Sequence, residues 1–185
     1  MDLNREEAFK LLSEYTQSDS LIKHALAVEA AMREYAKKFN EDVDLWGITG
    51  LLHDFDYERY PSKEEHPYKG AEILRQIGYP EEVVRAILGH ADYTGVERDT
   101  LMAKTLFAVD ELTGLIIACA YVNPERKISN VKVKSVKKKL KDKAFARSVN
   151  REDIYKGVDE LGVNLEEHIS LIINALSKIS DKLNL

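Results

Sequence analysis

The 185-residue chain is 44% hydrophobic and has a net charge of −5. A chain of this length can bury about two thirds of its unfolded surface, so one globular domain is expected, spanning residues 1–185. The longest apolar run, 115–122, is far shorter than the roughly 20 residues of a membrane span, and the amino terminus lacks a signal-peptide pattern, which excludes a membrane protein and favours a cytoplasmic one.

Helical periodicity dominates the sequence, and alternating strand-like runs are nearly absent. The first helix is expected to begin after Asn4, which can cap it, and a second, long helix covers 19–39. Two short helices follow Pro67 and Pro80, with Gly78 ending the earlier one. The remaining predicted helices cover 44–53, 100–121, the basic segment after 130, 151–161 and 165–183. The predicted fold is therefore a single compact all-α array of roughly nine helices.

The positive charge is concentrated in one segment. Residues 126–147 contain ten Lys or Arg and one acid, which leaves a charge of −14 for the rest of the chain. Apolar residues at 133, 136 and 140 favour a packed helix with its lysines in solvent. A cationic wall that attracts a phosphorylated substrate, or a weak nucleic-acid contact, is the other interpretation. The overall negative charge disfavours a nucleic-acid-binding protein.

Several polar side chains interrupt the apolar stripes. His24 lies on the apolar face of the second predicted helix, Asp110 interrupts the helix 100–121, and His53-Asp54 follows the apolar run 48–52. Unpaired buried charges cost on the order of several kcal/mol, and a divalent cation would compensate all of these groups. Taken alone, His24 could be a hydrogen-bonded core residue and Asp110 could pair with a Lys or Arg. Consecutive helical residues point about 100° apart, so His53 and Asp54 meet at one ion most easily at a helix end.

The order His24, His53-Asp54, His66, His90, Asp110 resembles the HD-domain superfamily of metal-dependent phosphohydrolases over about residues 20–115. The resemblance implies that His24, His53, Asp54 and Asp110 bind one metal ion. In binuclear members of the superfamily, Asp54 would bridge to a second ion that His66 and His90 bind. Residues from about 125 to 185 would form a C-terminal helical extension.

The resemblance does not extend to the HD-GYP branch of cyclic-dinucleotide phosphodiesterases. That branch has paired histidines where this chain has His90-Ala91, and its Gly-Tyr-Pro signature is missing after them. Here Gly78-Tyr79-Pro80 comes before His90 and is interpreted as a turn.

Imidazole and carboxylate ligands suit Mn, Fe, Co, Ni or Zn better than Mg, as one or two divalent ions. Such an ion would activate water for attack on a small phosphate ester, with nucleotides among the candidate substrates. The candidate catalytic residues are Asp54, Asp56, Lys69 and Asp92. Asp56 and Asp92 would orient the water or protonate the leaving group; the alternative is that each is a solvated carboxylate at the rim of the site. Charge on the phosphate would be neutralised by cations near the ligands in sequence: Lys69, Arg75, Arg98 or Lys104.

Two other functions stay open at this point. Some HD-fold proteins resemble the same six-residue pattern but hold a di-iron centre and oxidise an organic substrate, and ligand identity does not separate them from hydrolases. A non-catalytic module that senses a nucleotide is the third interpretation.

The sequence does not predict an oligomeric state. His168 is expected at the surface or in a cap, and Cys119 in the core.

Overall fold

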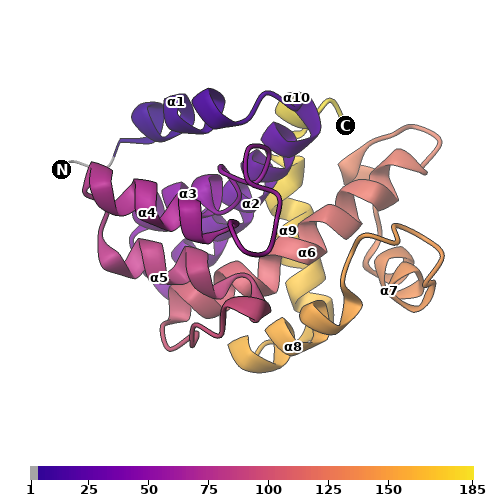
Figure 1. The fold of residues 1–185 in the computed structure, drawn as a ribbon. Coiled ribbons are helices and arrows are strands. Elements are labelled where there is room, and N and C mark those ends of the chain that lie inside the picture. Colours follow the sequence, from indigo (N-terminus) through magenta and orange to yellow (C-terminus); the bar gives the residue numbers. More distant parts are fainter. Residues whose placement is uncertain (1–3) are drawn as a thin grey trace.

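The computed structural model describes residues 4–185, which form an all-α fold without a β-strand among them (Figure 1). Two single turns of 3-10 helix, η1 (Asp92–Thr94) and η2 (Ile128–Asn130), accompany the α-helices. The α-helices are α1 (Arg5–Tyr15), α2 (Asp19–Phe39), α3 (Val43–Leu52), α4 (Tyr68–Ile77), α5 (Glu81–Gly89), α6 (Leu101–Tyr121), α7 (Val133–Lys141), α8 (Arg151–Leu161), α9 (Leu165–Ser177) and α10 (Ser180–Leu183).

Local signals in the sequence set most helix ends. The Asn4 side chain accepts a hydrogen bond from the backbone N–H of Glu6 and so caps α1. Gly78, with a φ of 95°, ends α4 in the left-handed conformation that glycine adopts without strain. The predicted helices are confirmed, except that the segment 165–183 is divided into α9 and α10 by a turn at Lys178 and Ile179.

Two long helices form the centre of the fold. Helix α2 packs against α3, α6 and α9, and α6 also packs against α5, α7 and α8. The contact of α8 with α6 is close at Gly157, because a Cβ atom there would lie 2.6 Å from the Cα of Ala108. This close approach fixes how near α8 lies to α6, and residues of both helices belong to the site described below.

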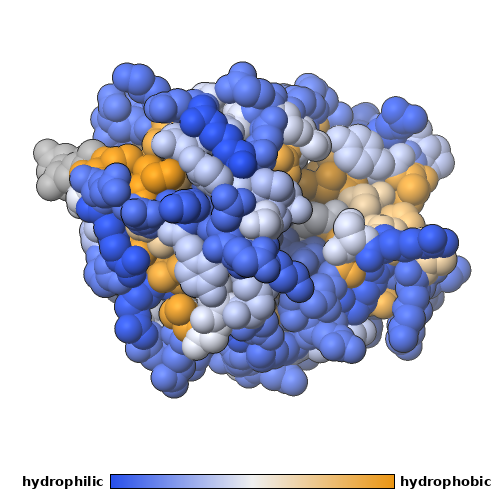
Figure 2. Space-filling view, viewed as in Figure 1, coloured by the Kyte–Doolittle hydropathy of each residue, from blue (hydrophilic) through white to orange (hydrophobic). Residues whose placement is uncertain are grey.

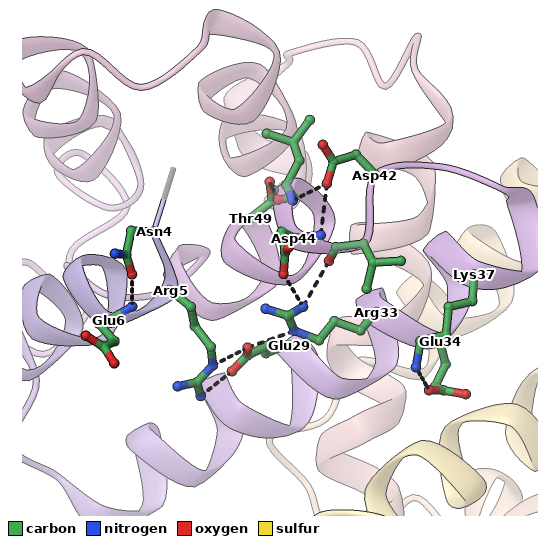
Figure 3. A network of polar contacts seen from close by, with 12 residues as sticks. Asn4, Arg5, Glu6, Glu29, Arg33, Glu34, Lys37, Asp42, Asp44 and Thr49 are labelled. Carbon is green, nitrogen blue, oxygen red and sulfur yellow. Dashed lines mark hydrogen bonds and ion pairs between the residues drawn. The ribbon is translucent and has the colours of Figure 1, made fainter. Parts of the chain in front are cut away.

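A polar network ties α1, α2 and α3 together (Figure 3). Glu29 on α2 is only 5% exposed, and its carboxylate accepts hydrogen bonds from Arg5 at 2.7 and 2.8 Å and from Arg33 at 2.9 Å. Arg33 also donates to Asp44 at 2.8 Å. A buried carboxylate is tolerated when cations pair with it in this way, so the network supports the packing of the first three helices.

The expectation that His168 lies at the surface is wrong. Its side chain on α9 is fully buried, where Nε2 donates to the carbonyl oxygen of Ala108 at 2.8 Å and Nδ1 accepts from the hydroxyl of Tyr35. His168 thus joins α9 to α2 and α6. Cys119 is buried, as expected. No helix in the described part of the chain is both long and apolar enough to cross a bilayer.

Candidate metal centre

The structure brings all six predicted ligands together from five parts of the chain. His24 comes from α2 and Asp110 from α6, while His53 and Asp54 follow the last turn of α3. His66 lies in the loop before α4 and His90 directly after α5. Helix ends supply His53 and His90, so the backbone can turn there and direct the neighbouring side chains at one point.

One half of the cluster consists of His24, His53, Asp54 and Asp110. The Nε2 atom of His24 lies 2.9 Å from Oδ1 of Asp110. The Nε2 atom of His53 lies 3.4 Å from the same oxygen and 3.5 Å from Oδ2 of Asp54. Donor atoms of His24, His53 and Asp54 all lie within 4.8 Å of one another, close enough to bind a single ion.

The other half consists of Asp54, His66 and His90. Oδ1 of Asp54 lies 3.2 Å from Nε2 of His66 and 3.1 Å from Nε2 of His90. These three residues form a second group whose donor atoms lie within 4.8 Å of one another. Asp54 therefore directs one carboxylate oxygen at each half of the cluster, which is the arrangement that a bridging ligand needs.

Three of the histidines have their second ring nitrogen fixed by a hydrogen bond. Nδ1 of His53 donates to the carbonyl of Gly50 at 2.8 Å, and Nδ1 of His90 donates to the carbonyl of Ile87 at 2.5 Å. Nδ1 of His66 donates to the Asp56 carboxylate at 2.8 Å. A proton held on Nδ1 leaves the lone pair on Nε2, the nitrogen that faces the cluster, so each imidazole is oriented as a metal ligand requires.

Two buried polar atoms of this cluster have no hydrogen-bond partner among the described residues, and a bound cation would compensate both of them. These atoms are Nε2 of His53 and Oδ1 of Asp54. Burial opposes a positive charge on His53, but the charges of Asp54 and Asp110 outweigh it and raise its pKa. Burial would likewise raise the pKa of Asp54, yet the neighbouring His53, followed by His66 and His90, lowers it. A cluster of imidazoles and carboxylates that attracts positive charge so strongly fits a divalent metal ion.

A cavity of about 600 Å³ opens onto the cluster. His24, Asp54, His66, His90 and Asp110 line it, whereas His53 is fully buried beneath them. In the view of Figure 2, the surface has a hollow between the loop after α3, near the centre, and the side of the molecule where α7 lies. The cavity gives a small molecule access to the cluster.

The three further catalytic candidates lie in different places. Asp56 is not on the rim as expected, because its side chain is buried and accepts hydrogen bonds from His66 and from the backbone N–H of Gly70, each at 2.8 Å. Lys69 lies outside the cavity lining and pairs with Glu72 at the surface. Asp92 does line the cavity. Burial would raise the pKa of Asp92, but hydrogen bonds from Lys156 and Arg98 outweigh it and lower that pKa.

Sequence reasoning did not identify Lys63, Glu111 or the start of α8 as parts of the cavity wall. Lys63 is the only Lys or Arg side chain of the described residues in the lining, and its Nζ lies 5.5 Å from the ring centroid of Tyr93. The far wall carries Glu111, where burial and the adjacent Asp110 raise the pKa to about 7, together with residues from the start of α8. No local pattern marks the residues of α8 as part of the wall, because α8 is distant in sequence from the ligands.

Comparison with known proteins agrees with this site. The HD domain family model matches residues 21–115, a range that includes all six clustered side chains. An uncharacterised protein of Methanocaldococcus jannaschii is 36% identical over 83 residues, which are 42% of this chain and 48% of that protein. The tRNA (cytidine(56)-2′-O)-methyltransferase of Thermoplasma volcanium is 36% identical over 80 residues, which are 43% of this chain and 23% of that enzyme.

The matched region thus spans about half of the first relative and about a quarter of the second. No solved structure matches the chain. The family model covers the segment that supplies every residue of the cluster, and the all-α fold is the one that this family requires. The chain therefore belongs to the HD domain family, whose members are mostly metal-dependent hydrolases.

Proposed function

We propose that the chain is a metal-dependent phosphohydrolase with two metal positions that share Asp54. His24, His53, Asp54 and Asp110 would hold one divalent ion, and Asp54, His66 and His90 would hold the other. The observation that carries this proposal is the placement of the two Asp54 oxygens, one 3.5 Å from His53 Nε2 and the other 3.2 and 3.1 Å from the Nε2 atoms of His66 and His90. The ligand set suits Mn, Fe, Co, Ni or Zn.

A divalent ion in such a site lowers the pKa of bound water and polarises a phosphoryl oxygen. The protein contributes the orientation of the ligands through their Nδ1 hydrogen bonds. Lys63 would neutralise charge on the phosphate, as the one Lys or Arg that lines the cavity in the described part of the chain. Asp92 is held ionised by Arg98 and Lys156, so it would accept a proton or a hydrogen bond from water rather than protonate a leaving group.

Asp56 would act as a positioning residue. Its carboxylate contacts His66 and Gly70 rather than the cavity, and a Cβ atom on Gly70 would lie 2.8 Å from the Asp56 carboxyl carbon. This tight packing would hold the His66 ring in place. Lys69 would have no catalytic role, since it pairs with Glu72 away from the cavity.

We further propose that the chain forms a single HD-type domain with a C-terminal helical extension. Helix α8 packs on α6, and the start of α8 lines the same cavity as the ligands. Residues 1–3 lie outside the described part of the chain.

The test compares two activities of the same protein preparation. Phosphate release from a panel of nucleotides and simple phosphate esters is measured with Mn²⁺ or Co²⁺, and O2 consumption is measured with Fe²⁺. We expect metal-dependent phosphate release and two ions per chain. Asp54→Asn should reduce binding at both positions, whereas His90→Gln should reduce it at one. O2-dependent turnover without phosphate release would refute the hydrolase proposal in favour of di-iron oxygenase chemistry.

A further inference from the structure

A second cavity adjoins the one at the metal cluster. It has a volume of about 580 Å³ and lies between the end of α7 and the start of α8. Asn150 and Glu152 line both cavities, so the two are neighbours that share a wall. Four cations line the second cavity: Lys141, Lys143, Arg147 and Arg151. Arg151 is bound to backbone carbonyls, which leaves Lys141, Lys143 and Arg147 facing solvent. A molecule at the metal cluster could therefore extend past the start of α8 toward these three cations.

The three cations are not neutralised by neighbours. Lys141, Lys143 and Arg147 are exposed and form no ion pair within residues 4–185. Two other lysines of α7 differ in this respect, because Lys137 pairs with Glu166 and Lys139 pairs with Asp142. Glu152 is the one carboxylate that lines this cavity within the described residues, so three unpaired cations leave a local positive potential that attracts anions.

The loop that carries two of these cations has a fixed backbone. The Arg151 guanidinium donates hydrogen bonds to four carbonyl oxygens of this loop: those of Asp142 at 3.3 Å, Ala146 at 2.6 Å, Val149 at 2.7 Å, and Phe145. One side chain thus holds the turn between α7 and α8. Lys143 and Arg147 project from a backbone that needs little ordering when a ligand binds, which lowers the entropic cost of binding.

The wall between the metal cluster and these cations has the opposite character. Glu111, Glu152 and Asp153 line the metal cavity there, together with Asn150. Carboxylates repel a phosphate but accept hydrogen bonds from hydroxyl or amino groups. A ligand that fits both cavities would therefore have an uncharged middle with hydrogen-bond donors and an anionic group at each end.

We propose that the substrate carries two phosphate groups on a hydroxyl-bearing or amino-bearing core, as in a nucleoside bisphosphate. One phosphate would reach the metal cluster, the core would lie against Asn150 and Glu152, and Lys141, Lys143 and Arg147 would bind the second phosphate. The inference rests on the proposed phosphohydrolase function. In the reaction, the oxygen of water forms a bond to phosphorus as the ester P–O bond breaks, and the leaving alkoxide takes up the proton that the water loses.

The test uses adenosine 3′,5′-bisphosphate and adenosine 5′-monophosphate as probes. The variant Lys141→Gln/Lys143→Gln/Arg147→Gln removes three of the four cations that line the second cavity and keeps Arg151, whose guanidinium is bound to backbone carbonyls. The matched control is Lys132→Gln/Lys134→Gln/Lys138→Gln, which removes three exposed charges from the same region outside that cavity. All six side chains are exposed, so both variants should fold.

Each exposed ion pair contributes little, but three together matter, so we expect the ratio of kcat/KM for bisphosphate over monophosphate to fall about tenfold in the first variant. The ratio should keep its wild-type value in the control. Calorimetry of adenosine 3′,5′-bisphosphate with protein free of added metal should show weaker binding in the first variant alone. This binding measurement does not depend on turnover.

The outcomes separate the two proposals. Equal kcat/KM for both probes in the wild type, or an equal loss in the two variants, would overturn the inference and leave the hydrolase proposal intact. If neither probe nor any other phosphate ester is hydrolysed with any of the metals, the hydrolase proposal fails. In that case, calorimetry still decides whether the three cations bind the second phosphate.

Discussion

Replacing Asp56 with asparagine should weaken metal binding without touching a ligand. Oδ1 of Asp56 accepts the Nδ1 proton of His66 and Oδ2 accepts the backbone N–H of Gly70, both at 2.8 Å. Asparagine has only one acceptor oxygen in its amide, and its other end donates. If the oxygen keeps the bond to Gly70, the amide NH2 faces Nδ1 of His66, and the imidazole proton moves to Nε2. That nitrogen faces Asp54, where a metal ligand must be unprotonated.

The opposite orientation of the amide is no better. It keeps the bond to His66 but places the NH2 group against the N–H of Gly70, in a site where Asp56 is only 1% exposed. A buried donor without an acceptor costs about 1–3 kcal/mol. Loss of the partner behind a ligating histidine typically lowers metal affinity about 10-fold to 100-fold, which is about 1.4–2.7 kcal/mol.

The assay is titration of the metal-free protein with Mn²⁺ or Co²⁺ for Asp56→Asn and for a control, Asp153→Asn. Asp153 lines the cavity wall, and its carboxylate accepts a hydrogen bond from Asn150 rather than from a histidine. The control removes the same negative charge but leaves every imidazole oriented. Unchanged affinity in Asp56→Asn, or an equal loss in both variants, would refute the role of Asp56 in orienting His66.

Two further predictions concern stability. Burial lowers the pKa of His168 to about 4, so between about pH 6.5 and pH 4 the unfolded chain binds a proton there that the folded chain does not. Neutral His168 therefore contributes its full stabilisation above about pH 6.5. The free energy of unfolding falls by about 3 kcal/mol as the pH drops from there to 4. His168→Gln should remove that part of the pH dependence in urea unfolding, and an unaltered slope would contradict the assignment. Gly157→Ala should destabilise the fold by about 1–3 kcal/mol, because its Cβ would overlap the backbone of Ala108 on α6. Thermal unfolding checks this, and an unchanged Tm would show that α8 can move away from α6 without loss.

Much of the site could be predicted because its signals are local. The apolar stripe that carries His24 and the apolar run before His53 define helices through contacts within a few residues of each other. Apolar helix faces pack into the core, so His and Asp side chains on those faces were expected to be buried near one another. The structure brings His24, His53, Asp54, His66, His90 and Asp110 into one cluster, while their roles as metal ligands stay a prediction.

Other features depended on which surfaces of distant helices meet. Asp56 is buried because Gly70 leaves room for its carboxylate, and His168 is buried because α9 packs against both α2 and α6. Neither fact follows from the residues next to them in the chain. Lys63 and the start of α8 line the cavity for the same reason, as loops and helix ends from far apart in sequence come together there.

The sequence by itself determined the helices and the set of residues that could bind metal, because helix capping and periodicity act over one or two turns. Only the tertiary structure decided that Asp54 faces both halves of the cluster and that unpaired cations lie in a cavity beside it. Those properties depend on how helices rotate and pack against one another, and packing is set by contacts between residues that are distant along the chain.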